Sequence, residues 1–589
     1  MIILLIGAMP MKSLLKKYRI LVFSFLILGL FVTCRSLPGL FTGGNSHSFD
    51  DFCTKLFQDE VTDNTMNLHF TLTNPKAAGI DSYDVTLGSI SGNSTKESAQ
   101  ELEKLRNQLK QYSRHSLNRE EKLTCSVLTD YISRQQSLAD FPFYEEVLTP
   151  SSGVTSQLPV LLAEYQFYCK QDIEDYLTLL SQMDSYYAQL LDYEQEKSDA
   201  GLFMSDRSCM KVIDGCEVFT ENPEDNFLFD TFSNRLESFD GLTNSQKQDY
   251  IERNKTVIAE HVIPAYELMI SGLTSLLGSG RNDWGLCNYE NGKAYYEALV
   301  ACNTGCDDGV ESLYQQIEDA RKEDLSVCAD ILAKNPKLAT ESPDLDTDLD
   351  NEEKMLTALA SAMRKDFPKP PETDCQICHV DPSLSEYLAP AFYITAPIDD
   401  YSKNRIYIND ANAYSDLYYF TTLAHEGYPG HLYQTIQSYH YGLEPIRSLL
   451  NYPGYTEGWA TYVEMQAYYY AGLPDDLAGL LQHNQAAVLS LYATSDIGIH
   501  YYGWEQADME KFWATYGFTD LEAIETITDL ILDEPGNYLK YYVGYLKFRQ
   551  LRSFYEEKYG DSFDAVAFHE AILRTGPAPF TIVEEQIMN

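Results

Sequence analysis

Basic residues are scarce in this 589-residue chain, which has 43 Lys and Arg against 88 Asp and Glu and a formal net charge of −45 at pH 7. Proteins that bind nucleic acid place clustered Lys and Arg on the phosphates. The composition therefore argues strongly against a nucleic-acid partner, and it disfavours binding to an anionic membrane surface for the same electrostatic reason. A surface excess of acid that keeps an exported protein soluble accounts for this balance.

The chain also lacks an apolar run long enough to cross a membrane. The uncharged run Ile20–Val32 has thirteen residues, whereas a spanning helix needs about 20. Four basic residues precede it: Lys12, Lys16, Lys17 and Arg19. This order is typical of an export signal, so we expect residues 1–34 to be a signal peptide.

Cys34 directly follows this signal and predicts a lipid anchor of the bacterial lipoprotein type. Thr33 departs from the pattern, because a lipoprotein signal usually carries a small residue just before its cysteine. Ordinary cleavage nearby is the alternative. Either way, the mature chain is expected outside the cytoplasm, as a cell-surface lipoprotein or a secreted protein.

The remaining cysteines raise the question of disulfides, which exported proteins often contain. Twelve cysteines less Cys34 leave eleven, an odd number, so at least one is not part of an internal pair. The sequence does not assign the pairs, and the close ones are Cys209 with Cys216, Cys302 with Cys306, and Cys375 with Cys378. The last pair, in Cys375–His379, also matches the haem attachment pattern CxxCH. A single short match inside a Pro-rich connector makes haem the less favoured alternative.

The N-terminal half is helical by pattern. Leu, Ile, Tyr and charged residues recur at a spacing of three to four, with few β-branched runs. The clearest segments are Glu101–Tyr112, Glu120–Gln136, Gln171–Lys197, Ser245–Leu277 and Asp308–Lys334. We therefore predict a helical N-terminal region over residues 35–381, followed by a second region over residues 382–589.

The second region is expected to open with a small β element. Residues 390–396 and 404–409 have strand composition and are separated by a short polar loop, which predicts two antiparallel strands. They precede a helix predicted from about residue 413. Residues 407–409 either form an edge that adds a peptide strand or belong to a purely structural hairpin.

That helix carries the stretch with the clearest chemistry. His425 and Glu426 are followed by His431, and Glu457 lies in a Glu-Gly-Trp-Ala sequence further on. Two imidazoles, a carboxylate and an open position are the ligands of a catalytic zinc site, and a neighbouring Glu is the usual general base. Histidines six apart would lie about 120° apart on a regular helix. The intervening Gly427–Gly430 predicts a bulge that turns His431 back, and an unrelated second His is the alternative.

The residues of this stretch, HEGYPGHLYQ, resemble the HExxPGHxxQ signature of the bacterial DUF885 family, which is similar to the gluzincin metallopeptidases of the thermolysin clan. Further stretches fit that family: Asn74–Asp84, Thr456–Glu464, Ser495–Trp504, Glu534–Arg552 and Phe568–Phe580. The resemblance implies a mainly α-helical, zincin-like fold with a deep cleft. It also implies one zinc ion per chain, held by His425, His431 and Glu457.

Other residues are candidates for supporting roles. His500 and Tyr541 lie in family-like stretches and have the chemistry to stabilise an oxyanion, although each also suits a core aromatic position. Glu464 is either a partner of a ligand His or a surface carboxylate. Four arginines are candidates for binding a substrate carboxylate, and nothing distinguishes among them: Arg405, Arg549, Arg552 and Arg574.

Taken together, these patterns predict an exported zinc metallohydrolase, with a peptide or dipeptide as the expected substrate and another small amide or an ester as the alternative. Glu426 is the expected general base, and His500 or Tyr541 the expected oxyanion donor. The alternative is a cell-surface binding lipoprotein that keeps the metallopeptidase fold without turnover.

Overall fold

The computed structural model describes residues 48–90, 94–112, 116–341, 343, 345, 349, 351–380, 390–410 and 415–588. The predicted export signal and Cys34 lie outside these residues. Within them, no helix combines the length and the apolar character needed to cross a membrane.

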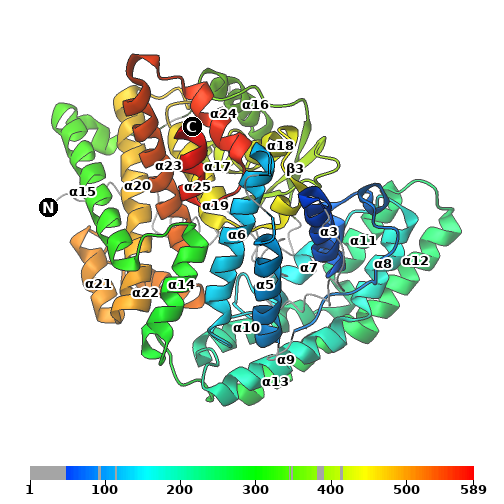
Figure 1. The fold of residues 1–589 in the computed structure, drawn as a ribbon. Helices are drawn as coiled ribbons and strands as arrows, with labels where there is room; N and C mark the ends of the chain where they lie inside the picture. The colour runs from blue at the N-terminus through cyan, green and yellow to red at the C-terminus, as the bar shows by residue number, and fades with distance from the viewer. Residues whose placement is uncertain are drawn as a thin grey trace.

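The fold is mainly α-helical, as predicted, with one small sheet (Figure 1). The helices of the first half are α3 (Phe49–Thr62), α4 (Thr65–Thr71), α5 (Ser94–Leu109), α6 (Arg119–Ala139), α7 (Val154–Glu164), α8 (Lys170–Leu180), α9 (Met183–Ala200), α10 (Asp206–Thr220), α11 (Phe227–Ser238), α12 (Asn244–Val257), the π-helical η4 (Ile258–Val262), α13 (Ile263–Leu276), α14 (Gly292–Thr304) and α15 (Val310–Lys334). Each of the five segments predicted as helical is found here. Two are interrupted: α8 gives way to α9 after Leu180, and η4 separates α12 from α13.

The second half contains the sheet and the helices that surround it. Its elements are α16 (Glu352–Ala362), β1 (Asp374–His379), β2 (Ala391–Ile394), β3 (Lys403–Ile408), α17 (Asp416–Glu426), α18 (His431–His440), α19 (Pro453–Ala467), α20 (Asp475–Ile497), the π-helical η9 (Gly498–Tyr502), α21 (Gln506–Thr515), α22 (Leu521–Asp533), α23 (Asn537–Tyr559), α24 (Ala565–Thr575) and α25 (Phe580–Met588). Short 3₁₀ turns link several of these elements.

The two largest hydrophobic cores among the described residues organise the fold. The larger joins N-terminal helices to the second half, since it contains Phe52 of α3 and Ile132 of α6 together with Trp459 of α19 and Phe548 of α23. The other is formed by residues between 66 and 276. In Figure 1, α15, α20, α23 and α19 stand side by side, and α9 and α13 pack together at the lower edge. The regions predicted on either side of residue 381 therefore share the larger core.

The sheet has the strand order β1-β3-β2. The predicted pair β2 and β3 is antiparallel, with Phe392 opposite Tyr407, and β1 adds a parallel strand on the other side of β3. The edge role suggested for residues 407–409 is wrong for Tyr407, because β3 is the central strand and both of its edges are paired. The sequence prediction missed β1, which lies in the stretch interpreted as a connector.

The cysteines of the described residues form no disulfide. This includes the three close pairs, so the disulfides considered from the sequence are not formed in this structure. Cys375 and Cys378 lie on β1, where residues three apart point to opposite faces of the sheet. A CxxCH strand of this kind does not present both thiols to one haem edge.

Candidate metal centre

The two candidate histidines lie on separate helices. α17 ends at Glu426 and α18 begins at His431. The link between them is tight, because a Cβ on Gly430 would lie 1.7 Å from the carbonyl oxygen of His425. Only glycine fits at such a contact. The sequence rightly indicates an irregularity here, but the expected bulge within one continuous helix is wrong: one helix stops and another starts.

α19 packs against this break and brings in the carboxylate. Trp459 Nε1 donates a hydrogen bond of 2.9 Å to the carbonyl oxygen of Pro429, in the middle of the link. Glu457 lies two residues before Trp459 on the same helix. The indole thus fixes the link between the two histidines relative to the helix that carries Glu457.

The side chains of His425, His431 and Glu457 meet in the interior, and all three are buried. Glu457 Oε2 lies 3.6 Å from His425 Nε2 and 3.3 Å from His431 Nε2. Zinc binds imidazole and carboxylate at about 2.0–2.2 Å, which separates the ligand atoms of a tetrahedral ion by about 3.3–3.6 Å. The spacing of these atoms therefore fits the donor set of a zinc site.

The surroundings of these atoms also favour a cation. Within the described residues, neither His425 Nε2 nor either carboxylate oxygen of Glu457 has a hydrogen-bond partner, although all are buried. Buried polar atoms are rarely left in that state, because desolvation costs about 1–3 kcal/mol and more for charged groups. Burial would raise the pKa of Glu457, but the facing imidazoles of His425 and His431 outweigh burial and lower it to about 2. The carboxylate is therefore ionised.

Glu464 supports His425 from the opposite side. Its Oε2 lies 3.1 Å from His425 Nδ1, and the carboxylate is buried. The surface alternative for Glu464 is therefore wrong. Burial lowers the pKa of His425, but Glu457, Glu464 and Glu426 outweigh it and raise the value to about 10. A carboxylate behind a ligand histidine orients the ring and increases its basicity.

Glu426 lies next to this cluster and is held by the small sheet. Its Oε2 accepts a hydrogen bond of 2.9 Å from the backbone N–H of Tyr393 on β2. The carboxylate is buried and close enough to contribute to the pKa shift of His425. The β element therefore fixes the carboxylate that the sequence predicts as the general base.

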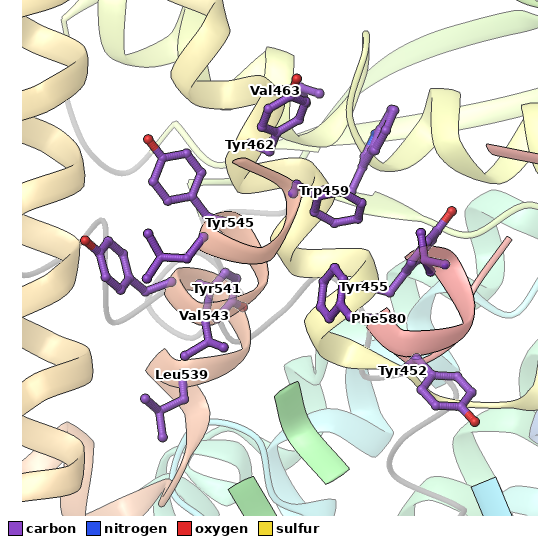
Figure 2. Close-up of a cluster of buried hydrophobic side chains, with 14 of the residues drawn as sticks. Tyr452, Tyr455, Trp459, Tyr462, Val463, Leu539, Tyr541, Val543, Tyr545 and Phe580 are labelled. Carbon is purple, nitrogen blue, oxygen red and sulfur yellow. The ribbon is translucent and has the colours of Figure 1, made fainter. Parts of the chain in front are cut away.

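Tyr541 of α23 completes the group. Its ring centroid lies 6.5 Å from that of His425, and its buried hydroxyl makes no hydrogen bond within the described part of the chain. Burial, with added effects of Glu457, Glu534 and Glu426, raises the pKa of this hydroxyl well above its ordinary value. Tyr541 therefore remains a neutral proton donor. Figure 2 shows the two helices involved, with Tyr455 and Trp459 along α19 and Tyr541 and Val543 along α23.

A glycine contact brings α19 and α23 this close. A Cβ on Gly458 would lie 2.4 Å from Gly544 Cα, and a Cβ on Gly544 would lie 2.2 Å from the carbonyl oxygen of Gly454. These atoms belong to backbones, which have no flexible end to move aside. The positions of Glu457 and Tyr541 therefore depend on glycine at the crossing, a requirement that the sequence analysis did not detect.

We expect Gly458→Ala to destabilise the protein by about 2 kcal/mol, because overpacking a close contact costs about 1–3 kcal/mol. An Ala for Gly exchange in an open helix does the opposite and stabilises by about 1 kcal/mol. Gly215 of α10 provides the matched control, since an added Cβ there meets nothing within 4 Å. Calorimetric unfolding should give a lower Tm for Gly458→Ala and an equal or higher Tm for Gly215→Ala. An unchanged Tm for Gly458→Ala would contradict the packing described.

His500 is not brought to this cluster. Its Nδ1 accepts a hydrogen bond of 3.2 Å from the backbone N–H of Leu286, and its Nε2 lies 2.9 Å from the carbonyl oxygen of Ile531. Both ring nitrogens are thus used by backbone groups. Burial lowers the pKa of His500 to about 4, so the ring is neutral. The structure therefore favours a core role for His500, and the expected oxyanion role is wrong for this geometry.

One cation near the cluster was missed. Lys540 Nζ lies 5.2 Å from the centre of the Tyr541 ring, and its charge contributes to lowering the pKa of Glu457. Three of the arginines considered from the sequence form ion pairs elsewhere: Arg549 with Asp324, Arg552 with Glu556, and Arg574 with Glu570. The feature of the sequence that indicates Lys540 is its position directly before Tyr541.

Comparisons with known proteins agree with the fold. A family model described as "Bacterial protein of unknown function (DUF885)" matches residues 74–587. The crystal structure of a "putative lipoprotein" from Colwellia psychrerythraea is 19% identical, with a TM-score of 0.80, and the match covers 92% of this chain and 99% of that one. A "putative lipoprotein of unknown function" from Shewanella oneidensis is 16% identical, with a TM-score of 0.63, over 92% of this chain and 100% of the other. No curated protein matches the sequence.

Proposed function

This chain belongs to the DUF885 family, and from that premise we propose that it is a zinc-dependent hydrolase that cleaves amide bonds in peptides. The observation that carries the proposal is the buried group of His425, His431 and Glu457, whose donor atoms have the spacing of zinc ligands. Glu426 and Tyr541 lie beside it. An acid–base residue, a neutral donor and a metal site are the components of metal-assisted hydrolysis.

The protein groups have distinct roles in this proposal. His425, His431 and Glu457 would hold the zinc ion, which would supply Lewis acidity and lower the pKa of a water molecule. Glu426, held by the backbone N–H of Tyr393, accepts the proton of the attacking water and delivers it to the leaving amine. Tyr541, which stays protonated because its pKa is raised, donates a hydrogen bond to the oxygen on which negative charge develops.

The second candidate is a cell-surface binding lipoprotein without turnover. The solved relatives described as lipoproteins support it, as does the lipidation predicted at Cys34. The two candidates share an extracytoplasmic location and differ in catalysis. The binding protein would take up zinc and peptide without producing new amino termini.

A peptide library tests the proposal directly. The zinc-loaded protein is incubated with mixed peptides, and mass spectrometry detects the new termini, with Glu426→Gln as the blank. Cleavage by the wild type and not by the blank supports the hydrolase. Equal product in both contradicts the role assigned to Glu426. The absence of product from every peptide despite bound zinc supports the binding protein instead.

Substitutions of Glu464 probe the support of His425 without removing a donor. We expect Glu464→Ala to weaken zinc binding about 100-fold, and Glu464→Gln about tenfold, because loss of an outer partner of a ligand His costs about 10–100-fold in metal affinity. The amide retains an oxygen that accepts from Nδ1 but lacks the charge. Competition with a fluorescent chelator measures both affinities. Wild-type affinity in Glu464→Ala would contradict this role.

A further inference from the structure

A cavity of about 420 Å³ lies apart from the metal donors, since none of the three lines it. Ligand-binding cavities commonly have volumes of about 300–1,000 Å³. The cavity is bordered by α5, α6 and α14, by residues 141–152 before and at the turn into α7, and by residues 532–537 at the start of α23. α6 and α14, which both contribute to its wall, pack against each other. Most of its wall is apolar.

The polar part of the wall has one sign of charge. Six carboxyl side chains line the cavity, and no Lys or Arg of the described residues does: Glu60, Glu145, Glu146, Asp283, Asp533 and Glu534. Aromatic rings surround them, among them those of Phe141, Phe143, Tyr144, Tyr193, Trp284, Tyr289 and Tyr295. Aromatic faces and carboxylates both attract organic cations.

Most of the inner carboxyls already have partners. Glu146 pairs with Lys197 at 2.6 Å, Asp533 with Lys211 at 3.0 Å, and Glu534 accepts from Ser151 Oγ at 2.7 Å. These groups hold the wall together. The charges of Glu146 and Asp533 are compensated without a ligand, and Glu534 already has a hydrogen-bond donor.

The carboxyl of Glu145 differs from these. Within the described residues it makes no hydrogen bond or ion pair, although it lines the cavity; Lys197 Nζ binds only the backbone carbonyl of Glu145, at 3.1 Å. Burial and the charge of Glu146 raise the pKa of Glu145 to about 8, against the effect of Lys197. Tyr144, the preceding residue, packs at 5.1 Å between ring centroids with Tyr295 and at 6.0 Å with Tyr289. A carboxyl beside such rings has the partners of an ammonium group.

We propose that this cavity binds an organic ammonium group carried on an apolar or aromatic body, with the Glu145 carboxylate as its ion-pair partner. Asn537, which lines the cavity, lies one helical turn before Tyr541 on α23. The ammonium is therefore assigned to a peptide substrate, as its free amino terminus or a basic side chain. That assignment rests on the proposed function, whereas ammonium binding itself does not.

Calorimetric titration of the purified full chain with phenethylamine, which is protonated at neutral pH, tests the binding. Its neutral isostere, 2-phenylethanol, is the reference. We expect the amine to bind at least tenfold more tightly than the alcohol, and Glu145→Gln to abolish that difference. Glu224→Gln, an exposed acid outside the cavity, should leave it unchanged. Absence of binding, equal affinity for the two compounds, or an unaltered preference in Glu145→Gln overturns the proposal.

Two peptides then identify the source of the ammonium. Phenylalanyl-alanine amide carries only an α-ammonium, and N-acetyl-phenylalanyl-lysine amide carries only a side-chain ammonium. Both are titrated into Glu426→Gln and into the double variant Glu426→Gln/Glu145→Gln, so that turnover does not enter. If binding of the first peptide depends on Glu145, the ammonium is the free amino terminus. If binding of the second peptide depends on Glu145, the ammonium is a basic side chain. Binding of neither overturns the peptide assignment. Phenethylamine binding without any hydrolysis in the wild type would overturn the proposed function, and the peptide assignment with it, but not the binding of ammonium by the cavity.

Discussion

Replacing Glu426 with Gln is expected to lower kcat by about 10³-fold while leaving zinc content unchanged. A positioned general base contributes about 10²–10⁴-fold. The amide cannot take up the proton of the attacking water. Glu426 lies beside the three proposed metal donors but is not one of them, so the metal site stays intact. The backbone N–H of Tyr393 still finds an oxygen acceptor in Gln, which preserves the local packing.

The measurements are kcat on a cleaved library peptide and zinc content by elemental analysis. Glu522→Gln serves as the control, because Glu522 is exposed on α22 and distant in sequence from every proposed site residue. Its kcat should match the wild type. Retention of more than a tenth of wild-type kcat in Glu426→Gln would contradict the assigned role.

Replacing His431 with Ala is expected to weaken zinc binding by more than 100-fold and to abolish hydrolysis. The side chain supplies one of three donors, so its loss should exceed the roughly 10–100-fold effect of an outer partner. The buried, ionised carboxylate of Glu457 also loses the imidazole of His431 that faces it. We therefore expect lower thermal stability as well.

His440 gives a matched control on the same helix, since it lies exposed at the end of α18. Chelator competition should show wild-type zinc affinity for His440→Ala and a large loss for His431→Ala. Full zinc occupancy of His431→Ala at equimolar metal would show that this histidine is not a ligand.

Much of the fold was predictable from local sequence. Periodic apolar residues predicted the long helices, and β2 and β3 followed from their strand composition. β1 was missed because Cys375–His379 pairs in parallel with a strand distant in sequence, and a tertiary contact of that kind leaves little local signal.

The site was predictable as a set of residue types but not as a geometry. The glycines around Pro429 indicated a break, yet the restart of a helix at His431 depends on the contact of Trp459 with Pro429. His500 and Tyr541 were indistinguishable in sequence, because each is a polar aromatic residue in a family-like stretch. In the structure, backbone groups from distant segments bind both ring nitrogens of His500, so its ring is not available to the site. The close glycine contact between α19 and α23 places Tyr541 beside the metal donors.

The zinc content of the wild-type chain tests the central claim most directly. The protein is prepared free of metal, reconstituted with zinc, passed through a desalting column and analysed for metal and protein. The account predicts about one zinc ion per chain, the stoichiometry of a single site with three protein donors. Absence of bound zinc after reconstitution would contradict the metal centre at His425, His431 and Glu457.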